Sequence, residues 1–220
     1  MFDRIARRYD RANTVLSFGT HHAWRRRAVR AASVASTDDC LDIACGTGDL
    51  SFALAKAAHE GSVTGVDFSP NMLEMAAHKA RAMDSEVVFQ QGDALQLEFP
   101  DDRFDVATNA FGVRNVDDPA KAIAEMARVV KPGGRVCVLE FGQPRGAWGA
   151  MYRFYSRRIM PSLGGLITGD RSAYEYLPQT AAAFPAGDAF VDLMREAATF
   201  EDVQAVPLQR GVAWIYVATV

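Results

Sequence analysis

Short apolar runs rich in β-branched residues alternate with amphipathic stretches along most of the chain. The runs predict strands at 40–44, 62–67, 86–91, 104–109, 135–141, 201–207 and 211–219. The amphipathic stretches predict helices near 49–58, 70–83, 119–130 and 188–198. Strands that alternate with helices are typical of a parallel sheet covered on both faces. The pattern therefore predicts an α/β fold with a doubly wound, mostly parallel, seven-stranded sheet.

Two segments fall outside this alternation. Residues 1–35 show no strand pattern and are expected to form N-terminal helices. In residues 142–186, prolines and glycines interrupt aromatic and arginine-rich pieces, which predicts a cap inserted before the last helix. A chain of 220 residues can bury a sizeable core without disulfides or metal, so a single domain, 1–220, is expected.

Cysteine usage and the lack of targeting signals bear on the compartment. Cys40, Cys45 and Cys137 are odd in number and have no Cys-x-x-Cys spacing, so neither a disulfide framework nor a zinc site is expected. No apolar run reaches the roughly 18 residues of a membrane span, and the arginine-rich start lacks the apolar centre of a signal peptide. A reducing, cytoplasmic compartment is the expectation.

Arginines are concentrated in two segments. Residues 1–30 hold eight arginines against two acids, and residues 142–171 hold five against one. Such clusters are typical of nucleic-acid sites, of contact with anionic membranes and of plain solvated helix faces. The interleaved aromatic and basic motifs of RNA-binding modules are absent, so no nucleic-acid partner is expected.

A glycine turn flanked by acids follows the first predicted strand. Gly46 and Gly48 permit backbone angles closed to other residues and let a ligand approach the main chain. Dinucleotide sites share this spacing, but they have a third glycine where this chain has Ser51, and Asp42 and Asp49 would repel a pyrophosphate. Carboxylates here favour the ammonium and sulfonium of S-adenosyl-L-methionine. A strand-to-helix turn without a ligand is the simpler alternative.

Polar side chains follow the next strands, at the edge where ligands of open sheets collect. Asp67 ends the second strand, where doubly wound folds keep an acid for ribose hydroxyls, although a helix cap is the alternative role. Asp93 is placed to accept from an adenine amino group, beside a backbone donor at Ala94. Asn109 ends the fourth strand, where cofactor and substrate are expected to meet.

Three segments carry signature-like patterns. They are Tyr9-Asp10-Arg11-Ala12-Asn13 with its continuation to His21 and Trp24, then Phe111-Gly112-Val113-Arg114-Asn115, and Arg128-Val129-Val130-Lys131-Pro132-Gly133-Gly134 with the ending Leu139-Glu140. Together they resemble the ubiquinone/menaquinone biosynthesis C-methyltransferase family of class I methyltransferases, over residues 1 to about 185. Tyr174-x-Tyr176-Leu177 is similar to a pattern of its cap. The chain departs from the family pattern at Ala12, Ala110, Gly142 and the tail from Gly211 to Tyr216.

The resemblance implies S-adenosyl-L-methionine as cofactor and a prenylated quinol as substrate. The implied reaction is C-methylation of the ring of demethylmenaquinol or of a 2-methoxy-6-polyprenyl-1,4-benzoquinol. Cofactor contacts are implied for Thr47, Asp67, Asp93 and Ala94. With the residues of the glycine turn and the strand ends, the expected cofactor-binding set is Asp42, Gly46, Thr47, Gly48, Asp67, Met72, Asp93, Ala94 and Asn109.

Methylation of a ring carbon needs a polarised or deprotonated hydroxyl, which raises the electron density on the neighbouring carbon. Arg114 suits this task because a guanidinium stays cationic and stabilises a phenolate, although a salt bridge to Asp117 or Asp118 is the simpler role. Asn115 is expected to orient the hydroxyl or a water. His21 is considered as a base near neutral pH. The expected catalytic set is Arg114, Asn115, His21 and Tyr174, and no metal is implied.

The cap contains an apolar stretch, residues 159–167, that is broken by proline and glycine. Two interpretations stay open: packing on the sheet, or a mouth for a polyprenyl tail with Arg157 and Arg158 on anionic headgroups at the inner face of a membrane. A homodimer is also left open. Other functions that remain are methylation of a different small aromatic acceptor, an NAD-binding oxidoreductase and a non-catalytic binding protein.

Overall fold

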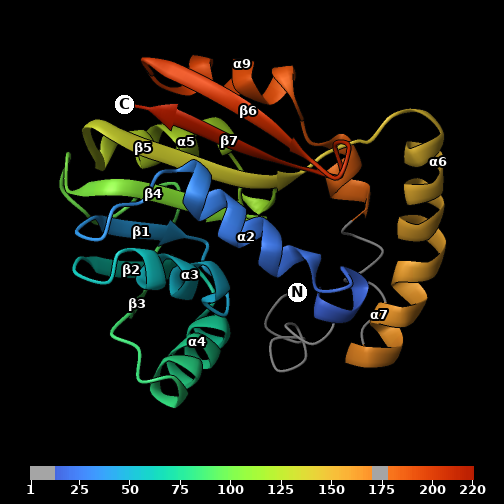
Figure 1. The fold of residues 1–220 in the computed structure, drawn as a ribbon, viewed down its shortest axis with the longest axis horizontal. Helices are drawn as coiled ribbons and strands as arrows, with labels where there is room; N and C mark the ends of the chain where they lie inside the picture. Colours follow the sequence, from blue (N-terminus) through green and yellow to red (C-terminus); the bar gives the residue numbers. More distant parts are fainter. Residues whose placement is uncertain (1–12, 170–177) are drawn as a thin grey trace.

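The computed structural model describes residues 13–169 and 178–220, and its centre is one sheet (Figure 1). Seven strands lie in the order β3-β2-β1-β4-β5-β7-β6. All neighbours pair in parallel except β7, which is antiparallel to β5 and β6. The strands are β1 (Asp39–Ile43), β2 (Ser62–Asp67), β3 (Val88–Gln91), β4 (Phe104–Ala110), β5 (Val130–Phe141), β6 (Asp202–Leu208) and β7 (Ala213–Thr219). The predicted doubly wound sheet is confirmed.

Helices cover both faces of the sheet. In Figure 1, α2 crosses in front of the sheet, and α5 lies behind it. The cap helices α6, η2 and α7 form a column beyond the strand ends. The helices are α2 (Thr20–Ala31), α3 (Asp49–Ala57), α4 (Pro70–Ala82), the 3₁₀ turn η1 (Val113–Asn115), α5 (Pro119–Arg128), α6 (Gly146–Phe154), the π-helical turn η2 (Tyr155–Ile159), α7 (Met160–Thr168) and α9 (Asp188–Ala197).

Helix α5 ends two residues earlier than the predicted helix near 119–130. Val129 and Val130 are β-branched and completely buried, which favours a strand. The carbonyl of Val129 accepts from the backbone N–H groups of Arg103 and Phe104, and Val130 pairs with Phe104 in the β4–β5 ladder. Tertiary pairing therefore overrides the local helical pattern.

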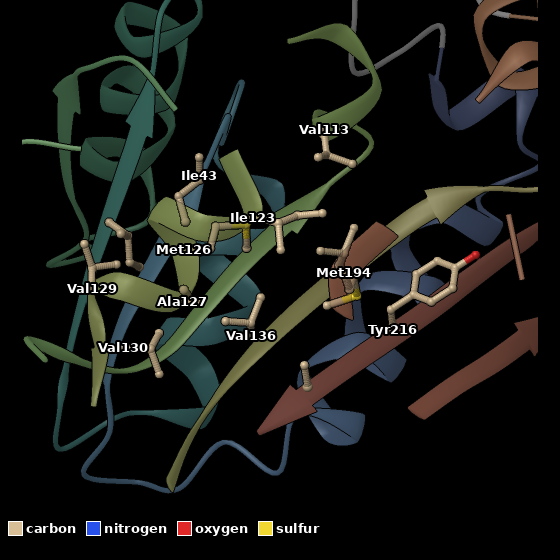
Figure 2. Packing of buried hydrophobic residues seen from close by; sticks show 14 of the residues in the cluster. Ile43, Val113, Ile123, Met126, Ala127, Val129, Val130, Val136, Met194 and Tyr216 are labelled. Carbon is tan, nitrogen blue, oxygen red and sulfur yellow. The ribbon is translucent and has the colours of Figure 1, made fainter. Parts of the chain in front are cut away.

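Two apolar clusters hold the layers together, one on each face of the sheet. Figure 2 shows the cluster under α5 and α9, in which Ile123 lies beside Met126 and Met194 lies beside Tyr216 of β7. All four are at most 1% exposed. Truncation of one such aliphatic side chain to alanine would cost roughly 2–5 kcal/mol. The well-packed sheet therefore holds the loops at its edge in fixed positions.

The strand order reverses between β1 and β4. The chain leaves β1 toward β2 on one side and later returns to β4 on the other. Loops that follow two such strands diverge and leave a crevice outside the carboxyl ends. The glycine turn after β1 and the segment after β4 both belong to this crevice.

Candidate functional site

Two cavities adjoin at the carboxyl edge of the sheet. The first, the strand-end cavity, has a volume of about 590 Å³ and includes Gly46, Thr47, Asp67, Met72, Asp93 and Ala94 in its wall. The second, the cap cavity, has a volume of about 420 Å³ and lies between α2 and the cap, with Leu16, Trp24, Phe141, Trp148, Tyr152 and Ile159 in its wall. Arg25 and Phe111 line both. The two cavities therefore share a boundary.

The glycine turn forms one wall of the strand-end cavity. Gly46 has a φ of +56°, and a Cβ built there would meet nothing within 4 Å, so the turn faces open space. Its backbone N–H donates to Asp67 Oδ2 at 2.7 Å. Since Asp67 also accepts from the backbone N–H of Ser69 at 2.9 Å, one carboxylate ties the turn after β1 to the turn after β2.

The charges around the strand-end cavity suit a cationic nucleoside. Four acids line it, namely Asp49, Asp67, Asp93 and Asp117. The Asp49 carboxylate pairs with Lys79 Nζ at 2.6 Å, and the same ammonium donates to Thr47 Oγ1 at 3.2 Å. Burial favours a higher pKa for Asp49, but the neighbouring Arg25 and Lys79 outweigh it and lower the pKa. The acids fit a ligand with hydroxyl and amino donors and positive charge, and fit a pyrophosphate poorly.

Three of the predicted cofactor residues do not line this cavity. The Asp42 side chain is 1% exposed and accepts from Ser51 Oγ at 2.6 Å and Thr108 Oγ1 at 3.1 Å, beneath the turn. Burial raises the pKa of Asp42 to about 6. The prediction of a direct contact from Asp42 is therefore corrected, because its strand position turns it into the protein interior.

Asn109 and Gly48 also have structural roles. Asn109 Nδ2 donates to the carbonyl of Ile43 at 2.8 Å, and its Oδ1 accepts from the backbone N–H groups of Gly112 and Val113. Asn109 thus fixes the loop after β4 to β1. Gly48 has a φ of +83°, and a Cβ there would lie 2.7 Å from Phe89, so glycine is required for backbone angle and packing.

Arg114 makes a buried ion pair at the wall of the cap cavity. Its Nη1 donates to Glu140 Oε1 at 2.8 Å and to the carbonyl of Phe111 at 2.6 Å. The Arg114 and Glu140 side chains are 4% and 1% exposed. Burial raises the pKa of Glu140, against the lowering effect of Arg114. The alternative of a salt bridge to Asp117 or Asp118 is wrong.

Arg114 and Asn115 face different cavities although they are neighbours on η1. Arg114 lines the cap cavity, and Asn115 lines the strand-end cavity. Within the part of the chain that the structure describes, three buried atoms here have no hydrogen-bond partner: Arg114 Nε, Asn115 Oδ1 and Glu140 Oε2. Buried polar atoms without partners are costly, which is consistent with a site that binds a polar ligand.

His21 lies in the wall of the cap cavity and is 4% exposed. Arg25 Nη1 donates to His21 Nδ1, and His21 Nε2 lies 3.2 Å from Thr14 Oγ1. Burial and the neighbouring Arg25 lower the pKa of His21 to about 3, so the imidazole is neutral. Since the Nδ1 lone pair already accepts from a guanidinium, this geometry disfavours His21 as a base near neutral pH.

His21, His22 and Asp49 form the one group in the described ranges with metal-ligand geometry, since their ligand atoms lie within 4.8 Å of one another. Two cationic side chains already contact residues of this group. Arg25 contacts the ring of His21, and Lys79 pairs with Asp49. A divalent ion would have to displace or face both, so the charges disfavour a metal at this position.

Some predicted residues lie elsewhere, and some residues with prominent contacts were not predicted. Tyr174, Tyr176, Tyr9 and Asp10 lie outside the described residues. The sequence interpretation assigned no role to Arg25, Lys79 or Glu140. Two of these had a signal: Arg25 directly follows Trp24 of the first motif, and Glu140 ends the third.

Two departures from the family pattern meet in space. A Cβ on Gly142 would lie 2.5 Å from Trp214 Cδ1 and 2.6 Å from the carbonyl of Gly211. Gly142 begins the cap segment, whereas Trp214 belongs to β7. The absence of a side chain at Gly142 therefore accommodates the indole of the unusual tail.

The whole chain, residues 1–220, matches the model of the ubiE/COQ5 methyltransferase family. The chain belongs to this family. It is 46% identical over 221 residues to the ubiquinone/menaquinone biosynthesis C-methyltransferase UbiE of Bdellovibrio bacteriovorus, with 100% of this chain and 94% of that protein covered. It is 49% identical over 218 residues to the demethylmenaquinone methyltransferase of Thermus thermophilus, with 99% and 98% covered. The predicted resemblance is confirmed, and the chain is an S-adenosyl-L-methionine-dependent methyltransferase.

Solved structures confirm the fold of this family member. An S-adenosyl-L-methionine-dependent methyltransferase of Methanococcus maripaludis superposes with a TM-score of 0.71 at 21% identity and covers 100% of this chain and 94% of that one. One from Thermotoga maritima gives 0.69 at 22% identity, with 99% and 97% covered. None of the helices that the structure describes is long and apolar enough to cross a membrane.

Proposed function

We propose that this chain methylates a ring carbon of a polyprenyl quinol in the formation of menaquinone, ubiquinone or both. The observation that carries the proposal is the pair of adjoining cavities: one lined by acids at the strand ends, and one apolar and aromatic beneath the cap. The names of the relatives support the same substrate class.

The strand-end cavity fits S-adenosyl-L-methionine, which supplies a methyl group activated by a sulfonium. Asp67 would accept from the ribose hydroxyls, because its carboxylate lines the cavity and is held in position by two backbone N–H groups. Asp93 accepts from the backbone N–H of Leu95 at 2.9 Å and would accept from the adenine amino group, beside Ala94. Met72 packs at the cavity wall and gives it an apolar surface.

The cap cavity fits a quinol ring. Phe111 and Phe141 lie with their ring centroids 4.4 Å apart, and Trp24 lies 6.1 Å from Phe111, so the wall at the shared boundary is aromatic. The Arg114 guanidinium lies 5.2 Å from the Phe141 centroid. A fixed cation at an apolar wall stabilises a quinolate oxygen more strongly than a cation in water does. Arg114 would thus favour the deprotonated hydroxyl that activates the ring carbon.

The outer rim of the cap cavity supports a further part of the proposal, a contact with the surface of an anionic membrane. Phe18 is 81% exposed and Phe154 63% exposed, and both line the cavity; Leu166 on α7 is 82% exposed. Arg157 and Arg158 on η2 are exposed as well. Apolar side chains with arginines beside them are typical of surfaces that lie in a headgroup region. A prenyl tail would then reach the ring site from the lipid.

Methyl transfer from labelled cofactor to a panel of quinols tests the substrate class. We expect transfer to demethylmenaquinols, to 2-methoxy-6-polyprenyl-1,4-benzoquinols or to both, with the new methyl group located on a ring carbon by NMR. Failure on every quinol, together with efficient transfer to an unrelated small aromatic acceptor, would overturn the assignment.

Flotation with vesicles tests the membrane contact. We expect salt-sensitive binding to vesicles that contain anionic lipid, and weaker binding after Phe154→Ser with Leu166→Ser. Met83→Ser is a matched control. Met83 is 51% exposed, but it directly follows α4 and does not belong to the cap. Equal binding of the protein to neutral and anionic vesicles would contradict the proposed surface. An equal loss of binding in Met83→Ser would contradict it too.

A further inference from the structure

Arg25 has a position that neither the motifs nor the proposed acceptor chemistry explains. It lies on α2 and lines both the strand-end cavity and the cap cavity. Among the described residues that line the strand-end cavity, it is the one cation, and four acids line the same cavity. A cation in such an acidic cavity calls for an anionic group in the ligand.

The Arg25 guanidinium is held on one side. Its Nη1 donates to His21 Nδ1, and its Cζ lies 5.6 Å from the centroid of the Phe111 ring. Its other hydrogen bond also runs from Nη1, to the carbonyl of His21 at 3.4 Å. A guanidinium has five N–H donors in a planar fork, so one edge stays available to a planar acceptor.

Within residues 13–169 and 178–220, no carboxylate forms an ion pair with Arg25. The charge of Arg25 lowers the pKa of one acid of the strand-end cavity, Asp49, but the ion pair of Asp49 is with Lys79, at 2.6 Å. Lys79 thus makes the direct contact with this acid, and Arg25 acts on it without a hydrogen bond. Among the described side chains, Arg25 hydrogen-bonds to His21 alone, so its other N–H groups are available to a ligand.

We infer that Arg25 binds the α-carboxylate of S-adenosyl-L-methionine. This rests on the proposed use of the strand-end cavity for that ligand. The carboxylate is the one anionic group of the ligand, since its ammonium and sulfonium are positive. Among the cavity's described side chains, only Arg25 has the complementary sign, and guanidinium–carboxylate pairs are bidentate and charge-assisted.

The pair would also set the geometry between the two ligands. Arg25 and Phe111 form the boundary between the cavities, so a carboxylate fixed on Arg25 places the amino-acid end of the cofactor at this boundary. His21 is then a positioning residue: its neutral ring accepts from Arg25 and holds the fork without competing for the ligand. This gives His21 of the first motif a role on the cofactor side.

Calorimetric titration with two ligands tests the inference without any quinol. S-adenosylhomocysteine carries the carboxylate, whereas 5′-methylthioadenosine lacks the whole amino-acid part. In Arg25→Met we expect the affinity for S-adenosylhomocysteine to fall roughly 10- to 100-fold, the range for hydrogen bonds to charged groups. The affinity for 5′-methylthioadenosine should change less than about threefold, because the lost partner is absent from that ligand.

Arg26→Met is the matched control, because Arg26 is the next residue on α2 but is exposed and lines neither cavity. It should leave both affinities unchanged. His21→Asn should weaken binding of S-adenosylhomocysteine less than Arg25→Met does, and should add nothing to it in the double variant. Arg25→Lys, which keeps the charge, should give an intermediate loss confined to S-adenosylhomocysteine, and it serves if Arg25→Met does not fold.

Equal losses for the two ligands would overturn the inference, because Arg25 would then shape the cavity as a whole. Unchanged affinities together with a raised KM for the quinol would overturn it too and assign Arg25 to the acceptor. These outcomes are distinct from failure of the proposed function. If the cavity does not bind the cofactor, the unaltered protein would bind neither S-adenosylhomocysteine nor 5′-methylthioadenosine. If only the acceptor is wrong, no quinol would be methylated, but Arg25→Met would still lose affinity for S-adenosylhomocysteine and not for 5′-methylthioadenosine.

Discussion

The strand-end cavity and the cap cavity differ in how their walls are built. The first is formed mainly by the segments after β1, β2, β3 and β4. Asp67 joins the turns after β1 and β2, and Asn109 joins the segment after β4 to β1. The second is formed by α2 and by the cap helices, which stand outside the sheet (Figure 1). The strand-end cavity is thus formed mainly by turns of the sheet, with Arg25 of α2 added to them, whereas the cap cavity depends mainly on elements outside the sheet. Substitutions should therefore separate the two functions.

The largest effect is expected at the ion pair behind the cap cavity. Arg114→Met leaves Glu140 buried without its cation, which should lower the free energy of unfolding by about 3–5 kcal/mol. Methyl transfer should fall at least about 100-fold, the scale for loss of one preorganised charge stabiliser. Urea unfolding and turnover measure the two effects.

The double variant Arg114→Met with Glu140→Gln separates these effects. Removal of the orphaned charge should restore most of the stability, while turnover stays low because the cation is still missing. Recovery of turnover together with stability would show that Arg114 acts on the fold alone. S-adenosylhomocysteine affinity should stay within about threefold in both variants, because Arg114 lies on the acceptor side.

A comparison of two aspartates tests the wall of the strand-end cavity. Asp67→Asn should weaken binding of S-adenosylhomocysteine roughly 10- to 100-fold, because a charged acceptor is lost and an amide meets the N–H of Gly46. Asp42→Asn should change this affinity less than about threefold, since Asp42 does not line the cavity. Calorimetry measures both affinities. A larger loss for Asp42→Asn than for Asp67→Asn would mean that Asp42 contacts the cofactor after all.

The pH dependence of stability gives an intermediate effect at Asp42. Its pKa is about 6 in the folded protein against an ordinary 3.8, so the folded state holds an extra proton between these values. Stability from this group is present below pH 3.8 and is lost as the pH rises through 6. Asp42→Asn cannot ionise, so its free energy of unfolding relative to the unaltered protein should rise between pH 4.5 and 7.5 by on the order of 1–3 kcal/mol.

His21 changes stability in the opposite sense, since its lowered pKa of about 3 makes the unfolded state bind more protons below its ordinary 6.5. His21 is present in both the unaltered protein and Asp42→Asn, so its contribution to the free energy of unfolding cancels in the comparison. Chemical unfolding at the two pH values measures the difference. A constant difference would mean that Asp42 keeps an ordinary pKa in the folded state.

The smallest effect is expected where the cap begins. Gly142→Ser should destabilise the protein by about 1–3 kcal/mol, because the new side chain overlaps Trp214. Donor affinity should not change, and the KM for the quinol should rise if the strain reaches the cap. The cost of Gly142→Ser should be smaller in a Trp214→Ala background than in the unaltered chain, as measured by thermal unfolding. An equal cost in the two backgrounds would contradict this contact.

The sequence by itself determined the sheet, the cofactor edge and the family. Short β-branched apolar runs separated by helical stretches have few stable arrangements, and the carboxyl ends of parallel strands converge whatever side chains they carry. That is why Gly46, Asp67 and Asp93 were predicted at one edge and lie in one cavity. The limits of α5 were less well predicted, because Val130 joins a ladder with a distant strand.

Only the tertiary structure decided which of the polar residues line a cavity. Asp67 is the last residue of β2 and Asp42 the last but one of β1, yet Asp42 is turned into the interior and Asp67 toward the cavity. Arg114 pairs with Glu140, 26 positions away, rather than with the acids beside it. Arg25 reaches both cavities because α2 packs across the strand ends. Local pattern fixes which elements form, but the partner of a charged side chain depends on how distant elements pack.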